Sequence, residues 1–134
     1  MKLSINKKTK IKDVQKIFSE IYPYLKVEFY KKPHGEKELS SVKDRISPEK
    51  IISEVGKFKS TAVIDINEGR TVADLEAEFY KKSGIALQVS RRTGKIWIET
   101  SLTDHRSLGM QNEQGKMAST TNKDTLLKEQ DFDR

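Results

Sequence analysis

Side chains that could carry acid–base chemistry near neutral pH are few in this sequence. The two histidines, His34 and His105, both fall in segments that we expect to be loops. Asp104 precedes His105 and Ser101 lies close by, which gives the residue types of a hydrolytic triad. Adjacency along the chain does not orient a nucleophile, a base and a carboxylate toward one another, and no HExxH motif is present. We therefore expect no catalytic residues, and we interpret the chain as a protein that is not an enzyme.

Standard motifs for a cofactor or a metal are also missing. The seven glycines are scattered, without the GxGxxG or GxxxxGK pattern that places backbone N–H groups around a phosphate. Cysteine does not occur, which excludes thiolate zinc sites and disulfide bonds. Asp74, Glu76 and Glu78 fall within one expected helix, and we interpret them as its solvated face and as partners of the helix dipole. We expect no cofactor and no bound metal.

Basic residues near the amino terminus indicate one binding surface. Lys8, Lys12 and Lys16 recur every four residues, which places them along one side of an expected helix and its approach. Such a stripe can face the phosphates of a nucleic acid. Residues 1–60 hold 15 Lys and Arg against 8 Asp and Glu, so the net charge of +6 is concentrated there. Lysine-rich faces also serve solubility alone, and nucleic-acid binding is therefore the alternative function.

A second surface combines Lys26, Tyr30 and Trp97 on the open face of an expected sheet. Aromatic rings on a sheet can stack on unpaired bases, but here they are sparse and carboxylates share the face. Large aromatic residues are also enriched where proteins meet. We therefore favour a noncatalytic binding or regulatory module that acts through protein–protein contact, with another protein or by weak self-association. The rival interpretation is that the tail, or residues 31–45, covers this face.

The elements that position these side chains follow from apolar spacing. Residues 1–5 and 25–29 alternate apolar and polar residues, as half-buried strands do. Between them, with Thr9 as the expected N-cap, apolar residues recur every three or four positions: Ile11, Val14, Phe18 and Ile21. Pro23 ends this helix near Tyr22, because the residue before a proline disfavours helical angles. The spacing predicts a strand, an amphipathic helix and a second strand.

Residues 61–90 repeat the plan of residues 1–30. Equivalent positions lie 61 residues later through the helix and 60 residues later in the strand that follows. The second helix has its own apolar stripe, formed by Val72, Leu75 and Phe79. Thr71 is its expected N-cap and Gly84 its expected left-handed C-cap. We interpret the two ranges as similar strand–helix–strand units, and leave common ancestry open.

Two further elements complete the pattern. The stretch SRRTGKIWIET predicts a hairpin that turns at a glycine. Its alternation puts Ile96 and Ile98 on the core side and Trp97 on the opposite face. Between the two units, residues 47–56 have the serine N-cap, first-turn proline and terminal glycine of a short helix.

Composition sets the limits of the folded part. Hydrophobic and charged residues each make up 34% of the chain, so part of it is expected to be solvated. Residues 108–134 are polar and weakly periodic, and we expect them to form a mostly disordered tail. No segment approaches the about 18 apolar residues of a membrane span, and the amino terminus lacks a signal-peptide run. We expect a soluble, cytoplasmic protein.

The segments YPYLKVEFYK, after the first expected helix, and RRTGKIWIETSLTDHRSLGMQNEQGK, near the carboxyl end, carry a resemblance. Together they resemble a family of small uncharacterised bacterial proteins with no assigned function. The similarity covers residues 1–116. It implies a small α+β domain and brings no activity, cofactor or catalytic residue.

These patterns predict one α+β domain over residues 1–107, in the order β-α-β-(α)-β-α-β-β. Each main helix has one apolar stripe and each strand one apolar side. We therefore expect a two-layer sandwich, with one mixed sheet and both main helices on one face. A ferredoxin-like plait with an extra hairpin is the first topology, and another α/β plait with a parallel central pair is the second.

Overall fold

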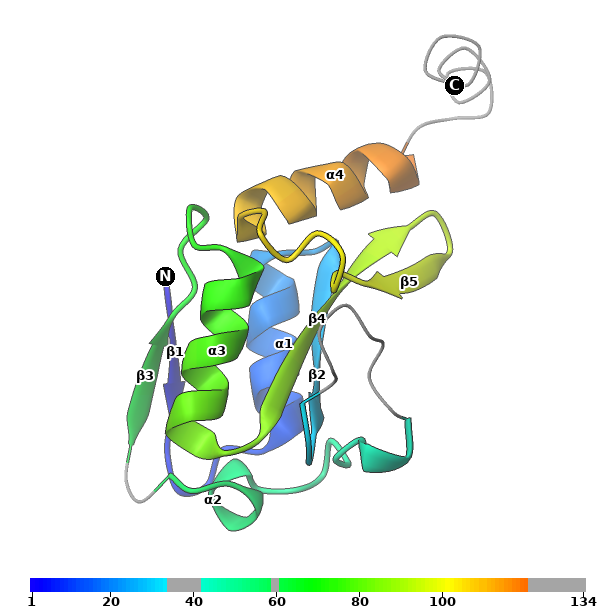
Figure 1. Cartoon of the computed structure of the whole chain (residues 1–134). Coiled ribbons are helices and arrows are strands. Elements are labelled where there is room, and N and C mark those ends of the chain that lie inside the picture. The colour runs from blue at the N-terminus through cyan, green and yellow to red at the C-terminus, as the bar shows by residue number, and fades with distance from the viewer. Residues whose placement is uncertain (34–41, 59–60, 121–134) are drawn as a thin grey trace, which may run out of the picture.

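The computed structural model describes residues 1–33, 42–58 and 61–120 of the chain. It contains five strands, four α-helices and one 3-10 helix, labelled in chain order: β1 (Lys2–Ile5), α1 (Ile11–Ile21), β2 (Leu25–Tyr30), η1 (Val42–Asp44), α2 (Ile52–Val55), β3 (Ala62–Asp65), α3 (Val72–Ser83), β4 (Ala86–Thr93), β5 (Ile96–Glu99) and α4 (Leu108–Thr120) (Figure 1). The predicted α+β class is confirmed. Within these residues, no helix combines the length and apolar character that crossing a bilayer requires.

The strands form two antiparallel sheets, which differs from the single mixed sheet that we expected. One sheet pairs β1 with β3, and the other has the order β2-β4-β5. Helix α1 contacts β1 and β2, and α3 contacts β3 and β4, so each helix packs on both sheets (Figure 1). A ferredoxin-like plait is not formed, because no ladder among the described strands joins the two sheets. Apolar alternation fixes which side of a strand is buried but not which strand pairs with it.

Each ladder between the two units contains one pair of residues at equivalent positions. Leu3 of β1 pairs with Ile64 of β3, its counterpart at an offset of 61. Glu28 of β2 pairs with Gln88 of β4, its counterpart at an offset of 60. The two ladders therefore pair each strand of the first range with the strand at the corresponding place in the second range.

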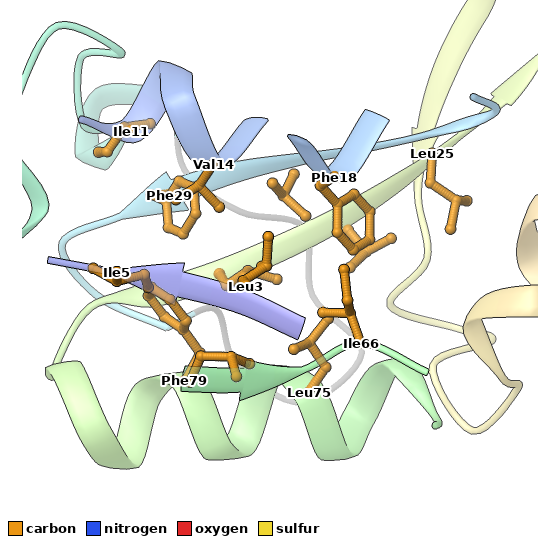
Figure 2. Close-up of a cluster of buried hydrophobic side chains, with 14 of the residues drawn as sticks. Leu3, Ile5, Ile11, Val14, Phe18, Leu25, Phe29, Ile66, Leu75 and Phe79 are labelled. Carbon is orange, nitrogen blue, oxygen red and sulfur yellow. The ribbon is translucent and has the colours of Figure 1, made fainter. Parts of the chain in front are cut away.

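One hydrophobic core lies between the two sheets and the helices α1 and α3. Its fully buried large side chains come from both units and include Leu3, Ile5, Phe18, Phe29, Ile66, Leu75 and Phe79 (Figure 2). The rings of Phe29 and Phe79 meet with centroids 5.2 Å apart. Each such side chain stabilises the fold by about 1.5–3 kcal/mol relative to an exposed one. The apolar stripes predicted for the two helices are confirmed as core residues except at Ile21, which is partly buried and packs against the core.

Hydrogen bonds at the start of α1 contradict two predictions, the N-cap at Thr9 and the start of the helix over residues 47–56. Thr9 does not cap the helix, because its hydroxyl accepts a hydrogen bond of 2.9 Å from the backbone N–H of Asn6. The first N–H groups of α1, from Ile11 and Lys12, donate instead to the carbonyls of Lys50 and Pro48, both at 3.0 Å. Those carbonyls are therefore engaged outside their own segment, and the helix predicted over residues 47–56 shortens to α2. Its predicted end at a terminal glycine is confirmed.

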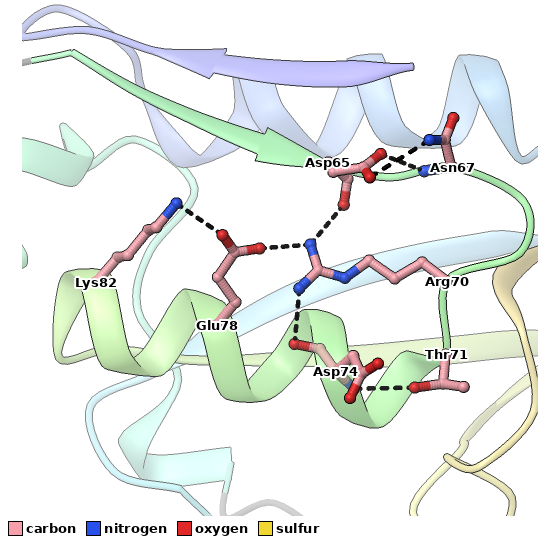
Figure 3. Close-up of polar contacts among 7 residues, drawn as sticks. All are labelled: Asp65, Asn67, Arg70, Thr71, Asp74, Glu78 and Lys82. Atoms are coloured by element: carbon pink, nitrogen blue, oxygen red, sulfur yellow. Dashed lines mark hydrogen bonds and ion pairs between the residues drawn. The ribbon is translucent and has the colours of Figure 1, made fainter.

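The ends of α3 agree with their prediction. The Thr71 hydroxyl accepts a hydrogen bond of 3.1 Å from the N–H of Asp74, and Gly84 takes the left-handed conformation at φ 77°. Arg70 fixes the turn before the helix, donating to the carbonyls of Asp65 at 2.9 Å and Asp74 at 3.1 Å and pairing with the Glu78 carboxylate (Figure 3). This network sets the position of α3 relative to β3.

Helix α4 overturns the prediction that the chain becomes disordered at residue 108. Leu108 is fully buried, and so is Gln111, which has partners at both ends of its amide. The amide nitrogen of Gln111 donates to the Thr103 carbonyl at 2.7 Å, and its oxygen accepts from Arg91 at 2.8 Å. Specific hydrogen bonds therefore order a segment that has few apolar residues. The rest of the predicted tail, residues 121–134, lies outside the described residues.

Candidate functional site

The β4–β5 hairpin presents an open strand edge. Thr100 donates its N–H to the Val89 carbonyl at 3.1 Å, which continues the ladder in which Arg91 faces Ile98. Hydrogen-bonded pairs alternate with non-bonded pairs along an antiparallel ladder. The N–H and C=O of Trp97 therefore point away from β4. No backbone hydrogen bond among the described residues reaches these two groups of Trp97, so they can pair with another strand.

Three consecutive large apolar side chains lie exposed on this edge. Ile96, Trp97 and Ile98 are 61%, 38% and 37% exposed. The prediction that both isoleucines join the core is wrong, because the hairpin extends past the end of the core. The two isoleucines do share one side of the strand, as expected. The turn at Gly94, with φ 67°, has the positive angle that the sequence indicates. The result is a projecting apolar strand.

Helix α4 braces the hairpin from one side. Ser119 accepts a hydrogen bond of 3.2 Å from the N–H of Gly94 and donates one of 3.4 Å to the Arg92 carbonyl. At Gly115 the helix approaches the backbone so closely that an added Cβ would lie 2.8 Å from the Cβ of Tyr24. These contacts hold the exposed strand in a defined position.

On the other face of the sheet, two of the predicted surface residues come together. The ammonium of Lys26 lies 5.0 Å from the centre of the Trp97 ring, within the range of a cation–π interaction. The same ammonium pairs with Glu28 at 3.5 Å, and Glu28 also pairs with Arg45 at 3.1 Å. The ammonium that contacts the indole therefore belongs to a row of paired charges, Lys26, Glu28 and Arg45.

Tyr30, the third residue predicted for this face, is only 3% exposed. Arg45 forms a β-bridge with it, and the N–H of Ile46 donates to the Phe29 carbonyl at 2.7 Å. Burial raises the pKa of Tyr30, as do the charges of Glu28 and Glu99, while Arg45 opposes the shift. Arg45 therefore covers the sheet face at Tyr30, as the rival interpretation expects, while residues 34–41 and 121–134, which belong to the same interpretation, lie outside the described residues.

The predicted lysine stripe lies on a separate element. Lys12 and Lys16 are exposed on α1, and Lys8 is exposed in the turn before it. Lys12 pairs with Glu49 at 3.2 Å, which reduces the charge that it offers to a phosphate. The three lysines do not combine with Trp97.

Basic side chains gather elsewhere, around a cavity of about 390 Å³. Lys31, Arg45 and Lys50 surround an apolar floor that includes Ile46 and Ile85. Of these cations, Arg45 is already paired with Glu28.

The carboxyl group of Glu76 marks a site that the sequence did not indicate. It accepts a hydrogen bond of 3.1 Å from the N–H of Val89. Burial raises its pKa from the ordinary 4.5 to about 8, the charges of Asp104 and Glu99 add to the rise, and the hydrogen bond from Val89 opposes it. Glu76 therefore holds a proton at neutral pH, and its assignment to the solvated face of the helix is wrong.

A cavity of about 250 Å³ opens beside this carboxyl group. Helix α3 and strand β4 form two of its walls, and the described residues that line it are Pro33, Ala73, Glu76, Ala77, Tyr80, Ala86, Leu87 and Asp104. A concave site with a shifted carboxyl pKa is the usual place to seek binding. Ala73 and Ala77, which flank Glu76 on the helix, were the available signal, because small side chains leave space beside it.

Comparisons with models of protein families, with curated proteins and with solved structures find no match. Among the residues that the structure describes, no three His, Asp or Glu side chains gather as a metal site would require. Among the described residues, we select two places for recognition, the β5 edge and the cavity beside Glu76, which we call the Glu76 pocket.

Proposed function

We propose that this chain is a noncatalytic protein-interaction module that binds its partner along the outer edge of β5. The observation that carries the proposal is the combination of outward N–H and C=O groups at Trp97 with exposed apolar side chains at Ile96, Trp97 and Ile98. An extended partner segment adds to such an edge as a further strand, with main-chain hydrogen bonds giving affinity and side chains giving specificity.

The surroundings of the edge favour tight recognition. Tryptophan is enriched among the residues that contribute most to binding, and Lys26 already orients the ring of Trp97. Helix α4 holds the hairpin before binding, which lowers the entropic cost of ordering it. A second copy of the chain, pairing β5 with β5, is the simplest partner because two such edges are self-complementary.

Nucleic-acid binding gains less support. A base-stacking platform needs Tyr30 beside Trp97, and Tyr30 is buried. The lysine stripe is partly neutralised at Lys12. We therefore retain protein contact as the function.

We also propose that the chain belongs to the family of small uncharacterised bacterial proteins that it resembles, and that it acts in the cytoplasm. The first segment that carries the resemblance contains β2, and the second contains the last three residues of β4, all of β5 and the first part of α4. Strands β2, β4 and β5 are neighbours in one sheet. The resemblance and the proposed interaction edge therefore fall on the same part of the molecule, which supports considering them together.

Sedimentation velocity over a range of concentrations, followed by partner capture from a lysate, tests this function. Trp97→Ala should weaken self-association or the capture of a specific partner while leaving the melting temperature nearly unchanged. Ile17→Ala is the matched control, because Ile17 is 40% exposed on α1, close to the 38% of Trp97. An unchanged sedimentation profile together with an unchanged set of captured proteins would count against the proposal.

A further inference from the structure

Among the described residues, the N–H and C=O of Leu87 have no hydrogen-bond partner, although Leu87 is buried. Strand β5 covers the outer edge of β4 only at residues 90–93. Beyond that point Glu76 takes the N–H of Val89, and Thr100 takes its carbonyl. Leu87 is the next residue whose N–H and C=O face the same edge, by the alternation of the ladder.

No hydrogen bond among the described residues uses these two groups of Leu87, although the residue is only 3% exposed. Buried backbone groups are nearly always paired, with protein, water or a ligand. Leu87 lines the Glu76 pocket, so a molecule in that pocket can supply the missing partners.

The charges of the pocket define what that molecule carries. Glu76 comes from α3 and Asp104 from the segment between β5 and α4, and the described residues that line the pocket include no Lys, Arg or His. Asp104 forms no ion pair within the described residues. Glu99 of β5 adds a third acidic side chain near this site. The pocket is therefore complementary to a cation.

We propose that the Glu76 pocket binds the amino terminus of an extended peptide. The terminal ammonium group lies between the carboxylates of Glu76 and Asp104. The N–H and C=O of the second residue pair with the C=O and N–H of Leu87, and the first side chain contacts the alanines of α3 and the Tyr80 ring. The volume of about 250 Å³ is below the 300–1,000 Å³ typical of drug-sized ligands, so one or two residues fill it.

Binding at this site is linked to protons. In the free protein Glu76, with a pKa of about 8, is protonated at pH 7. An ammonium group favours the ionised carboxylate, so binding at pH 7 releases a proton and strengthens as the pH rises toward 8. Above about pH 8 the ligand's own α-amino group loses its charge, and binding weakens again. The affinity therefore passes through a maximum near pH 8.

Three small probes separate these contributions in an amide-resolved NMR titration of the full chain. Alanyl-alanine amide has the ammonium and the amide, N-acetyl-alanyl-alanine amide lacks the ammonium, and n-butylamine lacks the amide. We expect the first to shift the amide signals of Leu87 and Val89 and to bind about tenfold more tightly than either of the others.

Variants then identify the carboxylates. Glu76→Gln keeps an oxygen that can accept from Val89, and it should weaken binding of alanyl-alanine amide about tenfold and remove the rise in affinity below pH 8. Asp104→Asn should also weaken it. Asp74→Asn, an exposed carboxylate on the same helix, is the control and should leave the affinity unchanged.

Two results overturn the proposal. One is equal binding of the acetylated and free-amine peptides, or no binding of either. The other is an affinity for alanyl-alanine amide that neither Glu76→Gln nor Asp104→Asn reduces. Neither result bears on the β5 edge, because the Trp97→Ala experiment tests that edge separately.

Discussion

The Glu76 carboxyl group and the N–H of Val89 form a hydrogen bond of 3.1 Å that joins α3 to the edge of β4. The bond lies where the pairing of β5 with β4 has ended, so a side chain takes the place of the missing neighbouring strand. Because the site is buried and faces Asp104, the carboxyl group is held in its protonated form. Folding therefore takes up a proton at Glu76 near neutral pH.

This proton uptake predicts how stability depends on pH. The pKa of Glu76 is raised from 4.5 to about 8 on folding. Between these values the folded state binds one more proton than the unfolded state, so the free energy of unfolding falls as the pH rises. The slope is about 1.4 kcal/mol per pH unit at its steepest. Above about pH 8 both states are ionised and the contribution becomes constant.

Glu76→Gln should remove that slope. Urea unfolding of both proteins at several values between about pH 5 and pH 8 measures it, and the difference in stability should shift in favour of the variant by a few kcal/mol as the pH rises. Parallel pH profiles for the two proteins would show that Glu76 titrates normally in the folded state.

The contrast between Glu76 and its neighbours shows what a sequence can predict here. Apolar spacing places Val72, Leu75 and Phe79 in the core, and the structure confirms it. The same spacing puts Glu76 at the border of that stripe, where burial depends on what packs against the helix. The edge of β4 packs against the helix at this point. That edge is open to Glu76 only because β5 stops pairing with β4 before it. Such long-range pairing is absent from local periodicity.

Helix α4 makes the same point for the domain boundary. Its order depends on hydrogen bonds to Gln111 and on close approach at Gly115, and neither contributes to a hydrophobic pattern. Low apolar content therefore predicted disorder for a segment that polar contacts hold in place.

Gly115→Ala should loosen this helix. An added Cβ would lie 2.8 Å from the Cβ of Tyr24 and 3.2 Å from the Arg92 carbonyl, so α4 has to move outward. We expect a loss of about 1–3 kcal/mol, reduced by the better helix propensity of alanine. Urea unfolding and hydrogen exchange of the α4 amides measure the change.

Gly69→Ala is the control for that substitution, since nothing lies within 4 Å of its added Cβ. It should change stability by less than about 0.5 kcal/mol. Equal effects of the two substitutions would mean that α4 does not pack at Gly115 as described.

Arg70→Lys should destabilise the turn between β3 and α3. A lysine cannot reproduce the fork of hydrogen bonds that joins the guanidinium to the carbonyls of Asp65 and Asp74 and to Glu78. We expect a loss of about 1–2 kcal/mol in thermal unfolding. Lys82 is the other partner of Glu78, and its side chain is 43% exposed. Lys82→Ala should therefore cost at most about 0.5 kcal/mol. If the lysine replacement at Arg70 costs no more than that, the network does not fix the turn.

Two isoleucines that the sequence assigns to the same core distinguish the projecting hairpin from the packed interior. Ile64 of β3 is fully buried, whereas Ile96 of β5 is 61% exposed. Ile64→Thr should lower the free energy of unfolding by about 2–4 kcal/mol, because it leaves a cavity and buries a hydroxyl. Ile96→Thr should cost less than about 0.5 kcal/mol in the monomer and weaken association through β5. Urea unfolding at low protein concentration, with sedimentation at high concentration, separates the two effects. A large loss of monomer stability from Ile96→Thr would place that side chain in the interior and remove the apolar edge on which the proposed function rests.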